Sequence, residues 1–166
     1  MNKYLILCVD DERHVLDSVQ QDLESFEANF IIEAAESVAE AKQVLESFTN
    51  QDDVALALIL CDHIMPVQTG ISFLVELDNQ AQTQRAKKVL LTGQADLEDT
   101  ILAVNQAHLD YYIAKPWDGA TLRDSVTKLL TDYVIEHDPD LMHWTSILDT
   151  ERILNALSEQ RAQFGE

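Results

Sequence analysis

The chain has 166 residues, of which 46% are hydrophobic and 25% are charged, the balance of a globular protein that can bury a full core. Thirty acidic residues against eleven Lys and Arg give a formal net charge of −19, which argues against direct nucleic-acid binding and against docking on anionic lipid. The longest apolar run, residues 54–61, is far shorter than the roughly 20 residues that span a bilayer, so we expect no membrane segment. No secretory leader is recognisable, and we therefore expect a cytoplasmic protein.

The cysteines and histidines give no sign of a zinc site. Cys8 and Cys61 lie inside apolar runs without paired spacing, and we expect two buried thiols in a reducing compartment. The five histidines show no metal-ligand spacing, and we expect them at the surface or at its boundary. They are His14, His63, His108, His137 and His143.

At the start of the chain, segments that suit strands alternate with segments that suit helices. Residues 4–9 are apolar on both faces, which is typical of a fully buried strand. Over residues 12–26 the apolar positions fall on one helical face, and a second strand is expected within residues 29–35. Ser37, with Glu40 three residues later, predicts the start of the next helix.

The same alternation continues through the middle of the chain. The remaining strands are expected at residues 54–61, 88–91 and 111–114. Thr69 and Gly70 open one helix, and Asp118 is a suitable N-cap for the last one. The helix expected over residues 95–107 carries an apolar stripe made of Leu97, Ile101 and Val104.

Five strands that alternate with helices predict a doubly wound α/β domain, with a five-stranded parallel sheet covered on both faces. Such sheets bind ligands beyond the carboxyl ends of their strands. Here the predicted strand ends are followed by carboxylates, a hydroxyl and an ammonium group. These belong to Asp10, Asp11, Asp62, Thr92 and Lys115.

Three carboxylates at one sheet edge need a positive partner. At a separation of about 4 Å and an effective dielectric near 20, each pair repels by roughly 4 kcal/mol. Lys115 is one candidate for the partner, and a hard divalent cation, above all Mg²⁺, is the other. A carboxylate beside such an ion can attack phosphorus, and Lys and Thr side chains suit the phosphoryl oxygens.

Four motifs carry a resemblance to a known family. They read Val9-Asp10-Asp11-Glu12, Asp62-His63-Ile64-Met65-Pro66 with Gly70, Leu91-Thr92-Gly93, and Tyr112-Ile113-Ala114-Lys115-Pro116. In this order and at four predicted strand ends, they resemble the receiver domain of two-component response regulators over about residues 3–131. The resemblance implies a flavodoxin-like sheet, as in the chemotaxis regulator, with strand order 2-1-3-4-5.

The resemblance also implies roles for individual residues. Asp62 would be the phosphoacceptor, receiving its phosphoryl group from a histidine kinase or a histidine phosphotransfer protein. Lys115 and Thr92 would contact the phosphoryl group, Tyr112 would follow the movement of Thr92, and the Lys115–Pro116 peptide would be cis. Mg²⁺ would be bound by Asp10, Asp11, Asp62 and the backbone carbonyl of Ile64.

Residues 132–166 form a helical extension beyond the receiver domain expected over residues 1–131. Pro139 interrupts the last receiver helix and suits the start of a new one. Two apolar stripes follow, one of Leu141, Trp144 and Leu148, the other of Ile147, Leu154, Leu157 and Phe164. The extension either packs back on its own receiver or serves as a dimerisation or signalling helix, and we favour self-association.

Several functions stay open from the sequence. A phosphorylation switch is the main hypothesis, and a phosphorylation-independent interaction module, or a fragment that regulates a signalling-enzyme output domain, is the alternative. A small-molecule phosphatase is disfavoured, because such enzymes with a nucleophilic Asp at the first strand carry a second Asp where Glu12 stands. We therefore expect no turnover of small molecules.

Overall fold

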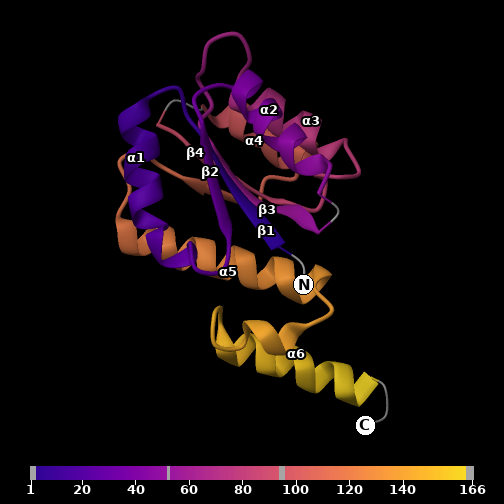
Figure 1. The fold of residues 1–166 in the computed structure, drawn as a ribbon. Helices are drawn as coiled ribbons and strands as arrows, with labels where there is room; N and C mark the ends of the chain where they lie inside the picture. Colours follow the sequence, from indigo (N-terminus) through magenta and orange to yellow (C-terminus); the bar gives the residue numbers. More distant parts are fainter. Residues whose placement is uncertain (1–2, 52, 94–95, 164–166) are drawn as a thin grey trace.

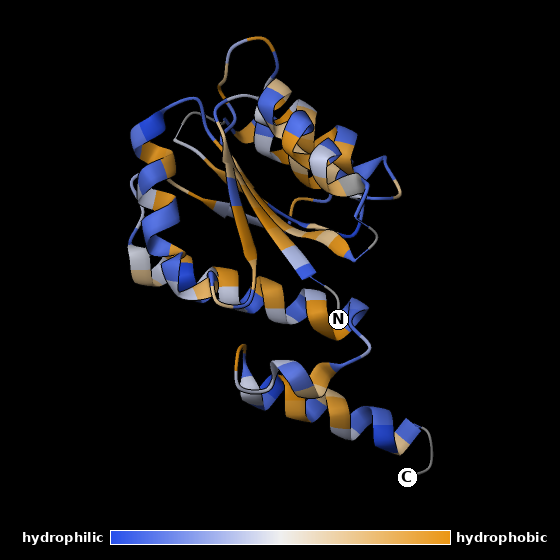
Figure 2. Cartoon of the chain, viewed as in Figure 1, coloured by the Kyte–Doolittle hydropathy of each residue, from blue (hydrophilic) through white to orange (hydrophobic). Residues whose placement is uncertain are grey.

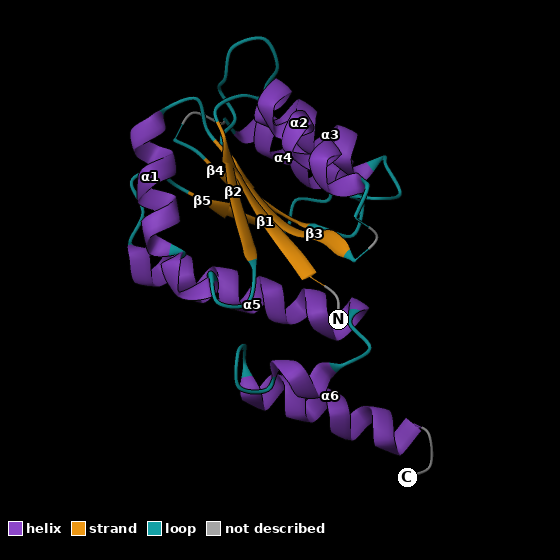
Figure 3. Ribbon diagram, in the orientation of Figure 1, coloured by secondary structure: helices purple, strands orange, loops and turns teal. Residues whose placement is uncertain are grey.

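A parallel sheet of five strands forms the centre of the molecule, in a computed structural model that describes residues 3–51, 53–93 and 96–163 (Figure 3). Its strand order is β2-β1-β3-β4-β5, which confirms the predicted fold class and strand order. The strands are β1 (Lys3–Val9), β2 (Ile31–Ala35), β3 (Val54–Cys61), β4 (Lys87–Leu91) and β5 (Tyr111–Ile113).

Helices cover both faces of this sheet (Figure 1). They are α1 (Arg13–Asp22), α2 (Val38–Thr49), α3 (Gly70–Asp78), α4 (Leu97–Ala107), α5 (Gly119–His137) and α6 (Thr150–Gln163). Two short 3₁₀-helices, η1 (Glu24–Phe26) and η2 (Leu141–Trp144), complete the order. Helices α1 and α5 lie on one face and α2, α3 and α4 on the other, while α6 lies beyond α5. In the described part of the chain, no helix has the length and apolar character that a membrane crossing requires.

Side-chain caps fix where several of these helices begin. The Ser37 hydroxyl accepts a hydrogen bond from the Glu40 backbone N–H over 3.0 Å, and the Asp118 carboxylate accepts one from the Thr121 N–H over 3.2 Å, so both predicted caps are confirmed. Asp96 caps α4 in the same way. The predicted start of α4 at residue 95 lies outside the described residues.

Two hydrophobic cores, one on each face of the sheet, explain why β3 and all of β1 after Lys3 are apolar (Figure 2). Alternate residues of β1 point to opposite faces, so Ile6 joins the core under α1 and α5 while Leu7 joins the core under α2, α3 and α4. Cys8 and Cys61 are buried in different cores, which confirms the expectation of buried thiols. Burial raises the pKa of Cys8 to about 12 and raises that of Cys61 as well.

Helix α4 does not bury the stripe that predicted it. Leu97, Ile101 and Val104 are 76%, 50% and 49% exposed, whereas Ala103 and Ala107 are buried against the sheet. The periodicity shows correctly that the three large residues share one side of the helix. That side faces outward because the small alanines occupy the crowded inner side.

The extension packs back on the receiver at the amino ends of β1 and β2. Leu141, Trp144, Leu148 and Ile153 are buried in the core that also contains α1 and α5. The indole of Trp144 stacks on the Phe30 ring, with ring centroids 5.2 Å apart. The structure therefore has the first of the two predicted arrangements, and self-association stays a prediction.

Polar contacts fix the extension in place. One carboxylate oxygen of Asp138, just after α5, accepts hydrogen bonds from the Tyr4 hydroxyl over 2.6 Å and from the Trp144 indole N–H over 2.9 Å. Arg152 of α6 forms an ion pair with Asp132 of α5. The expected boundary between residues 131 and 132 lies inside α5, and Phe164 lies outside the described residues.

Trp144→Ala is expected to lower the free energy of unfolding by about 3–5 kcal/mol, because it empties a buried site between Tyr4 and Phe30. Met142→Ala, in the same 3₁₀-helix, is the control, since Met142 is 60% exposed and should change stability by no more than about 0.5 kcal/mol. Urea denaturation measures both values. Equal stabilities of the two variants would contradict the docking of the extension.

Candidate functional site

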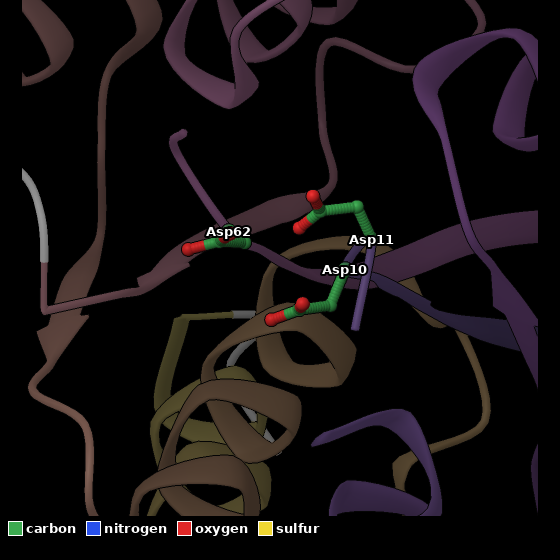
Figure 4. A group of neighbouring side chains, drawn as sticks. All are labelled: Asp10, Asp11 and Asp62. Atoms are coloured by element: carbon green, nitrogen blue, oxygen red, sulfur yellow. The ribbon is translucent and has the colours of Figure 1, made fainter. Parts of the chain in front are cut away.

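The backbone brings the first and third strand ends together. Beyond β1 and β3, the Asp62 N–H donates to the Val9 carbonyl over 2.9 Å, and the Asp10 N–H donates to the Ala35 carbonyl over 3.1 Å. These bonds continue the sheet pairing for one more residue. As a result the carboxylates of Asp10, Asp11 and Asp62 each place an oxygen within 4.8 Å of the others, as the sequence predicted (Figure 4).

Lys115, which follows β5, supplies the positive charge at this cluster. Its Nζ donates to an Asp10 carboxylate oxygen over 2.6 Å and lies 3.4 Å from Asp62 Oδ1. Burial raises the pKa of Asp10, although the hydrogen bond from Lys115 opposes this effect. Burial works to lower the pKa of Lys115, but its hydrogen bond to Asp10 and the charges of Asp62 and Asp10 outweigh burial and leave the pKa raised.

Lys115 alone does not balance the negative charge of the three carboxylates. One ammonium group faces three carboxylates, and Asp62 Oδ1 is buried without a hydrogen-bond donor among the described residues, since Lys115 contacts it only at ion-pair distance. A buried carboxylate oxygen left in this way is costly. Oxygen donors with excess negative charge fit a hard divalent cation such as Mg²⁺.

A cavity of about 920 Å³ opens beside the cluster. Asp11 and Asp62 line it together with Ile64, whose side chain is exposed. Its other walls include Lys115 and Trp117, and the Trp117 indole N–H is held by Asp22 of α1 over 2.7 Å. The cavity therefore gives a ligand access to the Asp62 carboxylate from this side.

The two residues predicted to switch also lie close together. Thr92 follows β4, is fully buried, and its backbone N–H donates to the Ile113 carbonyl over 3.1 Å. The Tyr112 hydroxyl donates to the Thr92 carbonyl over 2.9 Å. The Lys115–Pro116 peptide is cis, as predicted.

His63 corrects one expectation from the sequence. It is buried, not at the surface, and its Nε2 lies 3.3 Å from Asp99 Oδ2 of α4 while its Nδ1 lies 3.4 Å from the Ile71 backbone nitrogen. Its position directly after Asp62 was the only signal in the sequence, and the partners come from two later helices.

The close approach of α3 to the backbone of Asp62 requires a glycine at position 70, where α3 begins. Its N–H donates to the His63 carbonyl over 2.8 Å. A Cβ at this position would lie 1.7 Å from the Asp62 carbonyl oxygen, a backbone atom that cannot move away alone. The absence of a side chain therefore lets α3 rest directly against the residue that follows β3.

The order of the strands and the acidic cluster at their carboxyl ends define a receiver-type α/β protein. Comparison with known families agrees with this class. The family model of the response regulator receiver domain matches residues 6–127, so the chain belongs to this family. It is thus a receiver of two-component signalling, and receiver domains bind Mg²⁺ at an acidic site.

Relatives are found among proteins and among solved structures. The chain is 30% identical over 133 residues to the hydrogenase transcriptional regulatory protein HoxA of Cupriavidus necator, covering 80% of this chain and 25% of HoxA. It is 33% identical over 125 residues to the response regulator Rre1 of Synechocystis sp., covering 75% of this chain and 51% of Rre1. The chain therefore spans about a quarter and about half of the lengths of these relatives.

Among solved structures, a CheY-like response regulator receiver domain protein from Methanospirillum hungatei is similar. It is 30% identical, with a TM-score of 0.69, and the match covers 82% of this chain and all of that one. A signal receiver domain of an HD domain-containing protein from Pseudomonas fluorescens shares the fold, with a TM-score of 0.71, 24% identity, and coverage of 84% of this chain and 95% of that one.

Gly70→Ala is expected to lower the free energy of unfolding by about 3 kcal/mol or more, because the added Cβ collides with the Asp62 carbonyl. Gly93→Ala is the control, since its Cβ would lie 3.7 Å from the Lys115 carbonyl oxygen, an ordinary contact, and the substitution should cost less than about 1 kcal/mol. Chemical denaturation compares the two. A Gly70→Ala variant as stable as the control would contradict the close approach of α3 to Asp62.

Proposed function

We propose that this chain is a phosphorylation switch in which Asp62 accepts a phosphoryl group from a histidine kinase or a histidine phosphotransfer protein. The observation that carries the proposal is the Asp62 carboxylate itself. It is buried between Asp10, Asp11 and Lys115, one of its oxygens has no hydrogen-bond donor among the described residues, and it lines an open cavity.

The phosphoryl group would be transferred to Asp62 in a single displacement. A carboxylate oxygen of Asp62 attacks the phosphorus of a phosphohistidine, the new O–P bond forms as the N–P bond breaks, and the donor imidazole leaves. Lys115 stabilises the charge on the phosphoryl oxygens with its ammonium group. Asp10, Asp11, Asp62 and the backbone carbonyl of Ile64 would hold Mg²⁺, which when bound would neutralise further charge on the phosphoryl oxygens.

The readout is a shift between two conformations of the protein. The phosphoryl group attracts the Thr92 hydroxyl, and Tyr112 follows, because its own hydroxyl is bonded to the Thr92 carbonyl. Tyr112 packs against the core that contains Ala103 and Ala107 of α4, and the large apolar side chains of this helix are exposed. The surface formed by α4, β5 and α5 therefore changes the partner that it prefers, and a homodimer is one such partner.

The alternative is an interaction module that works without phosphorylation. The observations in its favour are the exposed apolar residues of α4, which could bind a partner directly, and the docking of the extension through its own core contacts. In that case oligomeric state and partner binding are the same with and without a phosphodonor. The transcriptional role in the name of HoxA is not carried over, because the match covers only a quarter of that protein.

Incubation with acetyl phosphate and Mg²⁺ is expected to give one phosphoryl adduct, because Asp62 lines the cavity, lies near Lys115 and has a carboxylate oxygen without a hydrogen-bond donor among the described residues. Intact mass spectrometry detects it. EDTA should abolish the adduct, and so should Asp62→Asn, which removes the nucleophile. A stable adduct in Asp62→Asn would contradict the assignment of Asp62, and no adduct in any sample would favour the phosphorylation-independent module.

Asp11→Asn is expected to weaken Mg²⁺ binding on the order of tenfold, since the affinity of such sites follows the charge of their ligands. Trp117, which lines the same cavity, provides a fluorescence signal for the titration. Asp17→Asn, on the exposed side of α1, removes the same charge away from the cluster and should leave the affinity unchanged. Equal losses in both variants would show a general charge effect rather than a ligand.

A further inference from the structure

Helix α4 is held to the rest of the receiver by few apolar contacts. Only Ala103 and Ala107 of this helix are buried, and its large apolar side chains face outward. Small side chains contribute little hydrophobic stabilisation, because they remove little apolar area from water. The position of α4 must therefore depend on other contacts, and the described structure has polar ones at both of its ends.

At the carboxyl end of α4, His108 contacts the buried carboxylate of Asp78. Its Nδ1 lies 2.6 Å from one carboxylate oxygen of Asp78, at the end of α3. The other oxygen of Asp78 lies 3.3 Å from the Nζ of Lys88, which is fully buried in β4. This end of the helix is thus tied to two elements through a buried carboxylate.

At the amino end of α4, the polar contact is made by the side chain of His63. The Ile71 backbone N–H can only donate, so the Nδ1 of His63 that faces it is the acceptor. In a neutral imidazole the hydrogen then sits on Nε2, which donates to the Asp99 carboxylate. The ring of His63 therefore bridges the first turn of α3 and the first turn of α4.

The two partners in this bridge differ in how freely they can move. His63 directly follows Asp62, and its carbonyl accepts the N–H of Gly70, which rests against the Asp62 backbone. Asp99 lies on the same side of α4 as Ala103 and Ala107, but its side chain, in the first turn, is 41% exposed. When Thr92 is drawn toward a phosphoryl group, α4 is the part that shifts, and the bond to His63 opposes that shift.

We propose that His63 and Asp99 are positioning residues that hold the start of α4 in its unphosphorylated position, so that their hydrogen bond sets how readily phosphorylation of Asp62 moves the helix. This inference rests on the function proposed above. It assigns to the buried histidine beside the phosphoacceptor a role in the switching equilibrium, with the carboxyl end of α4 as the fixed end.

Asp99→Ala tests this most directly, because it removes the acceptor from an exposed side chain and keeps the backbone N–H that Asp96 caps. His63→Ala is unsuitable, since it would also open a cavity. Glu98→Ala is the matched control, because Glu98 is an exposed acidic residue in the same first turn. Asp99→Asn retains an acceptor oxygen and serves as the rescue variant.

The first readout is the affinity for beryllofluoride, a phosphoryl mimic, measured with Mg²⁺ by Trp117 fluorescence. Asp99→Ala is expected to bind it roughly three- to tenfold more tightly than the wild type, which is the effect of losing one hydrogen bond. Glu98→Ala and Asp99→Asn should stay within about twofold of the wild type, and the Mg²⁺ affinity of all variants should be equal. An Asp99→Ala affinity that matches Glu98→Ala, or that is weaker than the wild type, overturns the proposal.

The second readout needs no phosphoryl mimic. In the unmodified protein, amide hydrogen exchange in the first turn of α4 should be faster in Asp99→Ala than in Glu98→Ala, with no change around His108. If the wild type binds no beryllofluoride, the proposed function fails, and hydrogen exchange alone then decides whether His63 positions α4. Equal exchange in the two variants overturns that role as well.

Discussion

The crowding of negative charge at the carboxyl edge of the sheet is the constraint on which the functional part of this molecule depends. Asp10 and Asp62 are buried side by side because the pairing of β1 with its neighbours continues past the strand ends. One ammonium group, that of Lys115, is not enough to balance them together with Asp11. The backbone has thus built a site with excess negative charge, which fits the ion that the proposed function requires.

The same constraint reaches the helices through backbone contacts. Gly70 allows α3 to approach Asp62 so closely that no other residue fits at this position. His63, which follows Asp62, contacts Asp99 of α4 through its side chain. The site contacts α3 through main-chain atoms and reaches α4 through the side chain of His63. This difference agrees with the proposed switch, in which Asp62 stays in place and α4 shifts.

The parts that the sequence predicted correctly follow local rules. Apolar runs located the strands, side-chain caps located helix starts such as Ser37, and parallel strands brought the predicted carboxylates together. The parts that it missed depend on contacts between distant segments. Periodicity shows that Leu97 and Ile101 share a side of α4, but not that this side faces outward. The burial of His63 likewise depends on partners from two later helices.

The docking of the extension has a consequence for where this domain ends. The family match stops at residue 127, but the hydrophobic core continues through Tyr133 and Trp144 to Ile153. Asp138 ties the first strand to this later segment through Tyr4. The folding unit is therefore longer than the segment that the family shares, and a cut at residue 127 would pass through α5 and remove part of one core.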